Sequence, residues 1–124
     1  MVTTGGSLER TVAEEFRRAL LEVRASLLRT VATTDDELET LERHQPGALT
    51  EDVAREQALA ILSRLGERER HELEEIYAAY ARLDAGIFGQ CEVCRRPIPL
   101  ARLRAMPTTR HCVACQARRE ATAP

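Results

Sequence analysis

The residues with the clearest chemistry are the four cysteines, which are all the cysteines of the chain and form two Cys-x-x-Cys pairs. They are Cys91, Cys94, Cys112 and Cys115, and seventeen residues separate the two pairs. This is the spacing of a zinc ribbon, in which two short knuckles supply four thiolates to a tetrahedral ion with little strain. Since four thiolates leave no position for water, we predict one structural zinc ion and no hydrolytic metal centre.

Two disulfides or redox-active thiol pairs are the alternative use of these cysteines. The first seven residues lack the charged and apolar regions of a signal peptide, and no apolar run approaches the ~20 residues that cross a membrane. We therefore predict a cytoplasmic protein without membrane contact. In the cytoplasm thiols stay reduced, so metal binding is favoured over disulfides.

His111, beside Cys112, is a weaker candidate ligand than the cysteines. The sequence shows no catalytic Ser/His/Asp set and no phosphate-binding glycine loop, so we do not predict an enzyme.

The elements that must position these cysteines are predicted to be long helices. Aromatic residues make up 3% of the chain and charged residues 31%, and Ala, Leu, Glu and Arg dominate, which is typical of helical rods. Apolar residues recur at helical spacing over residues 8–41 and again over 53–83. A break at Pro46-Gly47 separates the two stripes. We expect two helices of about 35 residues, each ~50 Å long, paired as an antiparallel hairpin.

The expected hairpin covers residues 7–85, between a disordered start at residues 1–6 and the finger. Folding the chain about residues 46 and 47 places Phe16 at the level of Tyr77, and it gathers these two with Tyr80 and Phe88 at the finger end. Thr34-Asp-Asp-Glu37 is a capping-box pattern, which predicts a bend or restart of the first helix near Thr33.

The second arm contains glycines that are expected to interrupt or end its helix. Gly66 lies where the apolar stripe is interrupted, at a cost of roughly 1 kcal/mol against Ala. Gly86 and Gly89 are expected to end the arm. The segment 86–121 is predicted to be a small finger with a short terminal helix near residues 113–121, followed by a tail at 122–124. The fold class is therefore all-α, a helical hairpin followed by a zinc-ribbon-like finger.

Charge is unevenly distributed along the chain. Residues 1–90 hold 18 acidic residues against 11 arginines, a net −7, whereas residues 91–124 hold two acidic residues against seven arginines, a net +5. Seven acidic residues lie between positions 35 and 52 with one arginine among them. Such runs are usually solvated faces, but at the end of a rod they suggest a functional tip near residues 44–52, with Glu51 and Asp52 as candidate residues.

The finger resembles that of the DksA/TraR family. The resemblance rests on one run and on several single positions that follow it: Gly86-Ile-Phe-Gly-Gln-Cys-Glu-Val-Cys94, then Ile98, Arg102-Leu103, Ala105, Pro107 and Cys112-Val-Ala-Cys115. About thirty residues match with high specificity, and the preceding hairpin extends the likeness loosely over most of the chain.

The resemblance implies a transcription regulator that binds RNA polymerase directly, without sequence-specific DNA contact. Its hairpin would enter the secondary channel, its acidic tip would approach the active-site region, and the lifetime of promoter complexes would change. We expect such a factor to be a monomer. The alternatives are an adaptor whose zinc finger docks another protein or a nucleic acid, and, with less support, a thiol redox sensor.

The chain departs from the family pattern in three places. Arg95 stands where the family has Gly after the second cysteine, at a knuckle position where glycine adopts positive φ easily. At the tip, Ala48, Glu51 and Val53 replace the pattern Asp-x-x-Asp-x-Ala, so that one carboxylate is kept. Where longer members bind ppGpp with cationic side chains, this chain has Glu75, Met106 and Gln116, and we do not expect ppGpp to bind at that site.

The basic finger offers candidate partner-binding residues, namely Arg95, Arg96, Arg102, Arg104 and Arg110. Arginines can contact nucleic-acid phosphates, but the finger lacks interleaved aromatic residues and a recognition helix, so an acidic protein surface suits them equally well. Arg102 is also a candidate for a structural role, in which it donates hydrogen bonds to finger carbonyls.

Overall fold

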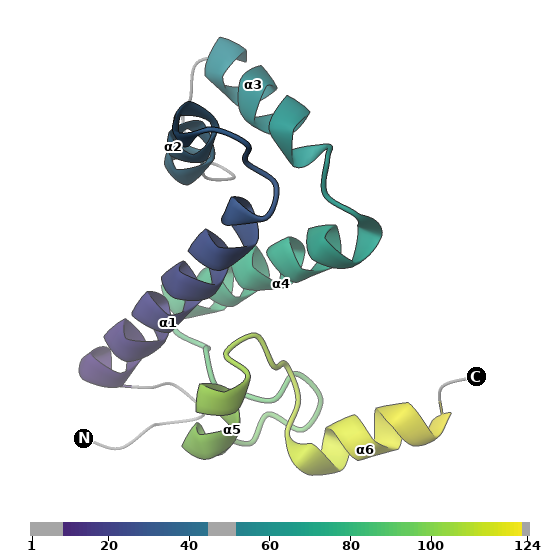
Figure 1. Cartoon of the computed structure of the whole chain (residues 1–124). Helices are drawn as coiled ribbons and strands as arrows, with labels where there is room; N and C mark the ends of the chain where they lie inside the picture. The colour runs from purple at the N-terminus through teal and green to yellow at the C-terminus, as the bar shows by residue number, and fades with distance from the viewer. Residues whose placement is uncertain (1–8, 45–51, 123–124) are drawn as a thin grey trace. The chain divides into compact units, whose positions relative to one another are not determined.

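The computed structural model describes residues 9–44 and 52–122, and within these ranges the chain is helical and contains no strand (Figure 1). The helices are α1 (Arg10–Arg29), α2 (Asp35–Arg43), α3 (Asp52–Leu62), α4 (Glu67–Asp84), α5 (Leu100–Ala105) and α6 (Val113–Thr122). The predicted all-α class is confirmed, including the terminal helix, whereas α5 was not predicted. No helix in the described part of the chain is both long and apolar enough to span a membrane. The expected disorder of residues 1–6, and the tip residues Ala48 and Glu51, fall outside the described ranges.

The chain divides into two compact units, one of which is built from two segments that are separate in sequence. One unit is continuous and comprises Leu21–Tyr77, and the other combines Met1–Leu20 with Ala78–Pro124. The helices α1 and α4 each contribute to both units. Within residues 21–77 the two arms run antiparallel, since Arg24 pairs with Tyr77 and the later Val31 carbonyl with the earlier Arg64, as expected for a helical hairpin.

The first arm restarts where the capping pattern predicted. The hydroxyl of Thr34 accepts a hydrogen bond from the backbone N–H of Glu37 at 3.1 Å, which caps α2. The Glu37 carboxylate reaches back to Thr33, where its Oε1 accepts from the backbone N–H at 2.9 Å and from the hydroxyl at 2.8 Å. This is a capping box displaced by one residue, and it satisfies amide donors that the start of a helix leaves without partners.

The second arm is also interrupted, so the expectation of one continuous helix there is wrong. The helix α3 ends at Leu62 and α4 begins at Glu67. The backbone N–H of Gly66 donates to the Glu69 carboxylate at 3.0 Å, which caps the start of α4. The low helix propensity of glycine and this local cap together favour a break over continuation.

The largest correction concerns the direction of α2. In a straight helix Arg24 and His44 would lie about 30 Å apart, because twenty residues rise 1.5 Å each. Instead the Arg24 Nη2 lies 2.7 Å from the carbonyl oxygen of His44, so α2 folds back toward α1. The ~50 Å rod predicted for this arm is therefore wrong. The register differs as well, because Tyr77 lies at the level of Arg24, eight residues further along than Phe16.

The folded-back helices give the unit of residues 21–77 a small apolar core. The helices α2 and α3 pack against each other, as seen at one end of Figure 1. The most buried apolar side chains of this unit are Leu27, Leu28, Val31, Leu41, Ala58, Ile61, Leu65, Leu73 and Ile76. Their burial supplies the main stabilisation that short helices need, since such helices are marginal in isolation.

In the other unit, the base of the arms packs on the finger. The rings of Phe16 and Phe88 lie 5.2 Å apart between centroids in a tilted arrangement, as aromatic pairs prefer. Both side chains are fully buried, so the predicted aromatic contact at the finger end is confirmed for this pair. An ion pair between Arg104 and Glu15, at 2.8 Å, also joins α5 to α1.

Candidate metal centre

The first knuckle begins directly after α4, whose end has the hydrogen bonds of a Schellman motif. The N–H of Gly86 donates to Leu83 O at 3.1 Å, and the N–H of Ile87 donates to Arg82 O at 3.0 Å. Gly86 has φ of 75° and Gly89 has φ of 86°, a region that side chains disfavour and glycine adopts readily. The predicted end of the second arm is confirmed at Gly86, whereas Gly89 lies beyond the helix in the turn before Cys91.

Backbone hydrogen bonds close the first knuckle around its cysteines. The Cys91 N–H donates to Arg96 O at 2.9 Å, and the Arg95 N–H donates to Cys91 O at 3.0 Å. Arg95 has φ of 65° and is the one non-glycine residue with positive φ in residues 9–44 and 52–122. The position where the family has glycine therefore requires the left-handed conformation, and Arg95 adopts it at a cost.

The second knuckle is held by α5, the helix that the sequence analysis missed. Leu103 of α5 is fully buried, and Arg102 donates from Nε to the carbonyl oxygen of His111 at 3.0 Å. The hydroxyl of Thr109 donates to the same oxygen at 3.2 Å. The structural role proposed for Arg102 thus has the expected geometry. Its guanidinium fixes the chain immediately before Cys112.

The two knuckles are also joined to each other directly. The Glu92 N–H donates to Arg110 O at 3.0 Å, and the side chains of the same two residues form an ion pair at 2.7 Å. These contacts bring the Cys-x-x-Cys pairs face to face although seventeen residues separate them in sequence.

The four cysteine sulfur atoms form one cluster, in which every Sγ lies within 4.8 Å of the others. The Sγ atoms of Cys94 and Cys112 are 3.8 Å apart. A tetrahedral zinc ion with Zn–S bonds of about 2.3 Å requires sulfur separations of about 3.8 Å. Cys91 and Cys115 are fully buried and the other two are half-buried. The donor set therefore fits one zinc ion in a closed site. His111 lies outside this cluster, although it is buried nearby.

The clustered thiols have pKa values that are shifted in opposite directions. Burial raises the pKa of Cys91, but hydrogen bonds from the backbone amides of Cys94, Cys112 and Val93 outweigh burial and lower this pKa to about 6. At Cys115 a guanidinium lowers the pKa, yet burial and the three neighbouring sulfurs raise it to about 11. Thiolates this close repel one another, so full ionisation requires a positive ion between them.

A residue that the sequence analysis missed completes the surroundings of the cluster. Arg118 donates from Nη2 to the Sγ of Cys115 at 3.2 Å. It lies one turn after Cys115 on α6, so the i, i+3 spacing was the signal that could have identified it. The hydrogen bond to Cys115 raises the pKa of Arg118, so the guanidinium stays charged beside the sulfur.

The candidate partner-binding arginines separate into two groups. Arg95 and Arg96 are exposed at the first knuckle. The other three make contacts within the unit that contains the finger (residues 1–20 and 78–124), here called the finger unit. These contacts, described above, are Arg102 with His111, Arg104 with Glu15 and Arg110 with Glu92.

Of the tip residues, Asp52 is exposed at the first position of α3 and lies 3.8 Å from Arg55. Glu51 falls outside the described residues.

Comparison with known proteins finds one family and several relatives. The sequence profile described as "Prokaryotic dksA/traR C4-type zinc finger" matches residues 86–121. The "RNA polymerase-binding transcription factor DksA" of Caulobacter vibrioides is 33% identical over 107 residues, which cover 86% of this chain and 75% of that protein. An uncharacterised protein of Aquifex aeolicus is 29% identical over 110 residues, covering 87% and 76% of the two chains.

Two solved structures are similar in fold. The transcription factor DksA2 from Pseudomonas aeruginosa has a TM-score of 0.60 and 30% identity, over 90% of this chain and 85% of that one. The RNA polymerase binding protein and transcriptional regulator Dks from Chlamydia trachomatis has a TM-score of 0.57 and 24% identity, over 91% and 92%, and this likeness concerns the fold alone. The profile match and the sulfur cluster agree that the finger holds one structural zinc ion.

Proposed function

Because this chain belongs to the DksA/TraR family, we propose that it is a transcription regulator that binds RNA polymerase through the secondary channel. The observation that carries the proposal is the relationship to an RNA polymerase-binding factor along 86% of the chain, together with the four-cysteine cluster that matches the family's finger. We propose that it acts in the cytoplasm as a monomer, without catalysis, membrane contact or sequence-specific DNA binding. The finger (residues 86–121) and the hairpin (7–85) would be its two functional parts.

The proposed roles follow from what each group can do chemically. The four cysteines hold the zinc ion, and this closed site stabilises the finger without activating water. Glu51 and Asp52 act at the tip, where carboxylates can influence the polymerase active-site region. Arg95 and Arg96 contact an acidic surface of the polymerase, because they are exposed while the other three candidate arginines hold the finger unit together.

Retention of the polymerase is the first test. Zinc-loaded chain carrying an affinity tag should retain RNA polymerase from its own organism, and Arg95→Glu with Arg96→Glu should weaken retention. Arg119→Glu serves as the matched control, because Arg119 is an exposed arginine of α6. No retention by the unsubstituted chain would refute the proposal and leave the adaptor as the better interpretation.

The tip is tested by transcription in vitro. Glu51→Ala with Asp52→Ala should weaken the effect on transcription while polymerase retention stays close to that of the unsubstituted chain. Glu56→Ala, an exposed acid one turn further along α3, is the control. An unchanged transcription profile for the double variant would leave these acids as ordinary solvated surface.

We also propose that the factor acts without enhancement by ppGpp at its junction with the polymerase. A highly charged nucleotide needs cations at its phosphates, whereas the family positions here are Glu75, Met106 and Gln116. The Gln116 side chain instead donates to Glu120 at 2.9 Å. The test is transcription with a polymerase whose own ppGpp site has been removed. A marked increase in the factor's effect on adding ppGpp would contradict this proposal.

A further inference from the structure

A buried arginine holds α2 in its folded-back position. Arg24 is 6% exposed, and its Nη2 donates to the carbonyl oxygens of Leu41 at 2.8 Å and His44 at 2.7 Å, with Glu42 O at 3.4 Å. Its Nε donates to the Tyr77 hydroxyl at 3.1 Å, and its guanidinium lies 5.8 Å from the centre of that ring. One cation from α1 therefore satisfies the last carbonyls of α2, which a helix end leaves without partners.

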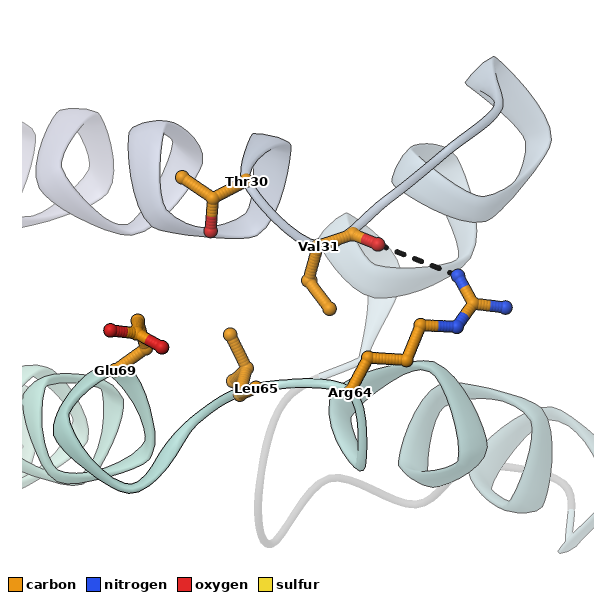
Figure 2. Close-up of a pocket in the computed structure, with 5 residues that line it drawn as sticks. All are labelled: Thr30, Val31, Arg64, Leu65 and Glu69. Atoms are coloured by element: carbon orange, nitrogen blue, oxygen red, sulfur yellow. Dashed lines mark hydrogen bonds between the residues drawn. The ribbon is translucent and has the colours of Figure 1, made fainter.

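A second arginine spans the breaks between the helices. Arg64 binds both carboxylate oxygens of Glu37 at 2.8 Å, and it approaches the Val31 carbonyl oxygen at 3.4 Å, as Figure 2 shows. Arg64 follows α3, Val31 follows α1, and Glu37 lies in the first turn of α2. Both interruptions of the hairpin are thus held by polar contacts.

The corner where these breaks meet is hollowed at the surface. A pocket of about 460 Å³ lies there, lined by Thr30, Val31, Arg64, Leu65 and Glu69 (Figure 2). Thr30 and Arg64 at this pocket are exposed, so solvent reaches the polar contacts that hold the corner.

The sequence of this arm also suits a straight helix. Residues 21–44 contain no proline or glycine, so the backbone has no fixed obstacle to continuing through residues 30–34. The apolar residues Leu27, Val31, Leu38 and Leu41 follow one another at intervals of four, seven and three, which places them on one face of a continuous helix. The same residues can therefore form two different packings.

We propose that Arg24 is a latch, and that the chain exchanges between this folded-back form and an extended form in which residues 21–43 make one helix. This inference rests on the proposed function. A deep, narrow channel on a partner admits a straight hairpin arm and excludes a folded-back one, so the partner draws the chain into the extended form. Arg24 then acts as a positioning residue for the part of the hairpin that leads to the tip.

The latch is tested on the isolated, zinc-loaded full chain. Spin labels carried by non-canonical amino acids at Glu22 and Arg43 leave the cysteines for zinc. The folded-back form should give a separation below about 20 Å, and a continuous helix about 32 Å, because 21 residues rise 1.5 Å each. Arg24→Met keeps an unbranched apolar stem but removes the cation, and it should move most of the population to the long distance. Arg18→Met, at an exposed arginine of the same helix, should leave the short distance unchanged.

A second variant reaches the extended form without removing a buried cation. Thr33→Ala with Thr34→Ala deletes the caps of α2 and favours helix through the break, so it should also populate the long distance, with helix content kept or raised. A short distance in both variants would overturn the proposal, as would broad distances accompanied by loss of helical circular dichroism. These measurements need no polymerase. The latch can therefore fail while polymerase retention succeeds, or the reverse.

Discussion

Replacing Arg95 with glycine should strengthen zinc binding. Arg95 holds φ of 65° in the first knuckle, and a non-glycine residue in this conformation costs about 1–2 kcal/mol. Glycine removes that cost but loses about 0.5–1 kcal/mol of backbone entropy on folding. At the midpoints of these ranges the net gain is about 0.75 kcal/mol, and since 1.4 kcal/mol is a tenfold change, the apparent zinc affinity should rise about threefold.

The assay is competition for zinc between the chain and a chromophoric chelator under reducing conditions. Arg96→Gly is the matched control, because it makes the same substitution at the next residue, where φ is not positive. It should weaken zinc binding about two- to fivefold, since only the entropic cost of glycine remains. If Arg95→Gly binds zinc no better than Arg96→Gly, the backbone strain assigned to Arg95 is refuted.

Three further predictions concern the metal and the charges. Cys94→Ser should abolish stoichiometric zinc binding by metal analysis while circular dichroism keeps most of the helical signal, and full zinc retention would contradict the assignment of this ligand. Arg118→Ala should speed zinc loss to a chelator several-fold relative to Arg119→Ala, because a charge-assisted bond to a ligand sulfur is removed; equal rates would show that the bond has no influence on the metal. The bonds from Arg64 and Thr33 lower the pKa of Glu37 to about 2 from its usual 4.5. The contribution of the Glu37 carboxylate to stability is therefore present above pH 4.5 and lost as pH falls through about 2. The difference in unfolding free energy between the unsubstituted chain and Glu37→Gln should shrink over that range, and a constant difference would contradict this role.

The sequence predicted the all-α class, the terminal helix and the metal cluster because these depend on local patterns. Two Cys-x-x-Cys pairs and the glycines that end α4 are read directly from residue type and spacing. The restart at Thr34 also has a local cause in its capping box. The positive φ of Arg95 was indicated by the family resemblance, because the family has glycine at this position.

The direction of α2 could not be predicted in this way. Periodicity shows which face of a helix is apolar, but it does not show whether that face continues straight or folds back. Whether the helix folds back depends on Arg24, whose guanidinium donates to carbonyl oxygens up to twenty residues away, and on Tyr77 from the other arm. Such long-range polar contacts have no signature in the sequence. Arg118 differs, because its i, i+3 spacing from Cys115 is a local pattern that could have identified it.

The division of the chain into units also has a consequence for the order in which it folds during synthesis. Residues 21–77 form a unit that is continuous in sequence, so all of its contacts become available before the first cysteine pair has left the ribosome. The first turns of α1 have contact partners that are synthesised much later. Phe16 must wait for Phe88, and Glu15 for Arg104, some ninety residues later in the second case. During this interval the ring of Phe16 is an exposed apolar group on a growing chain, and the finger can bury it only after Phe88 has left the ribosome.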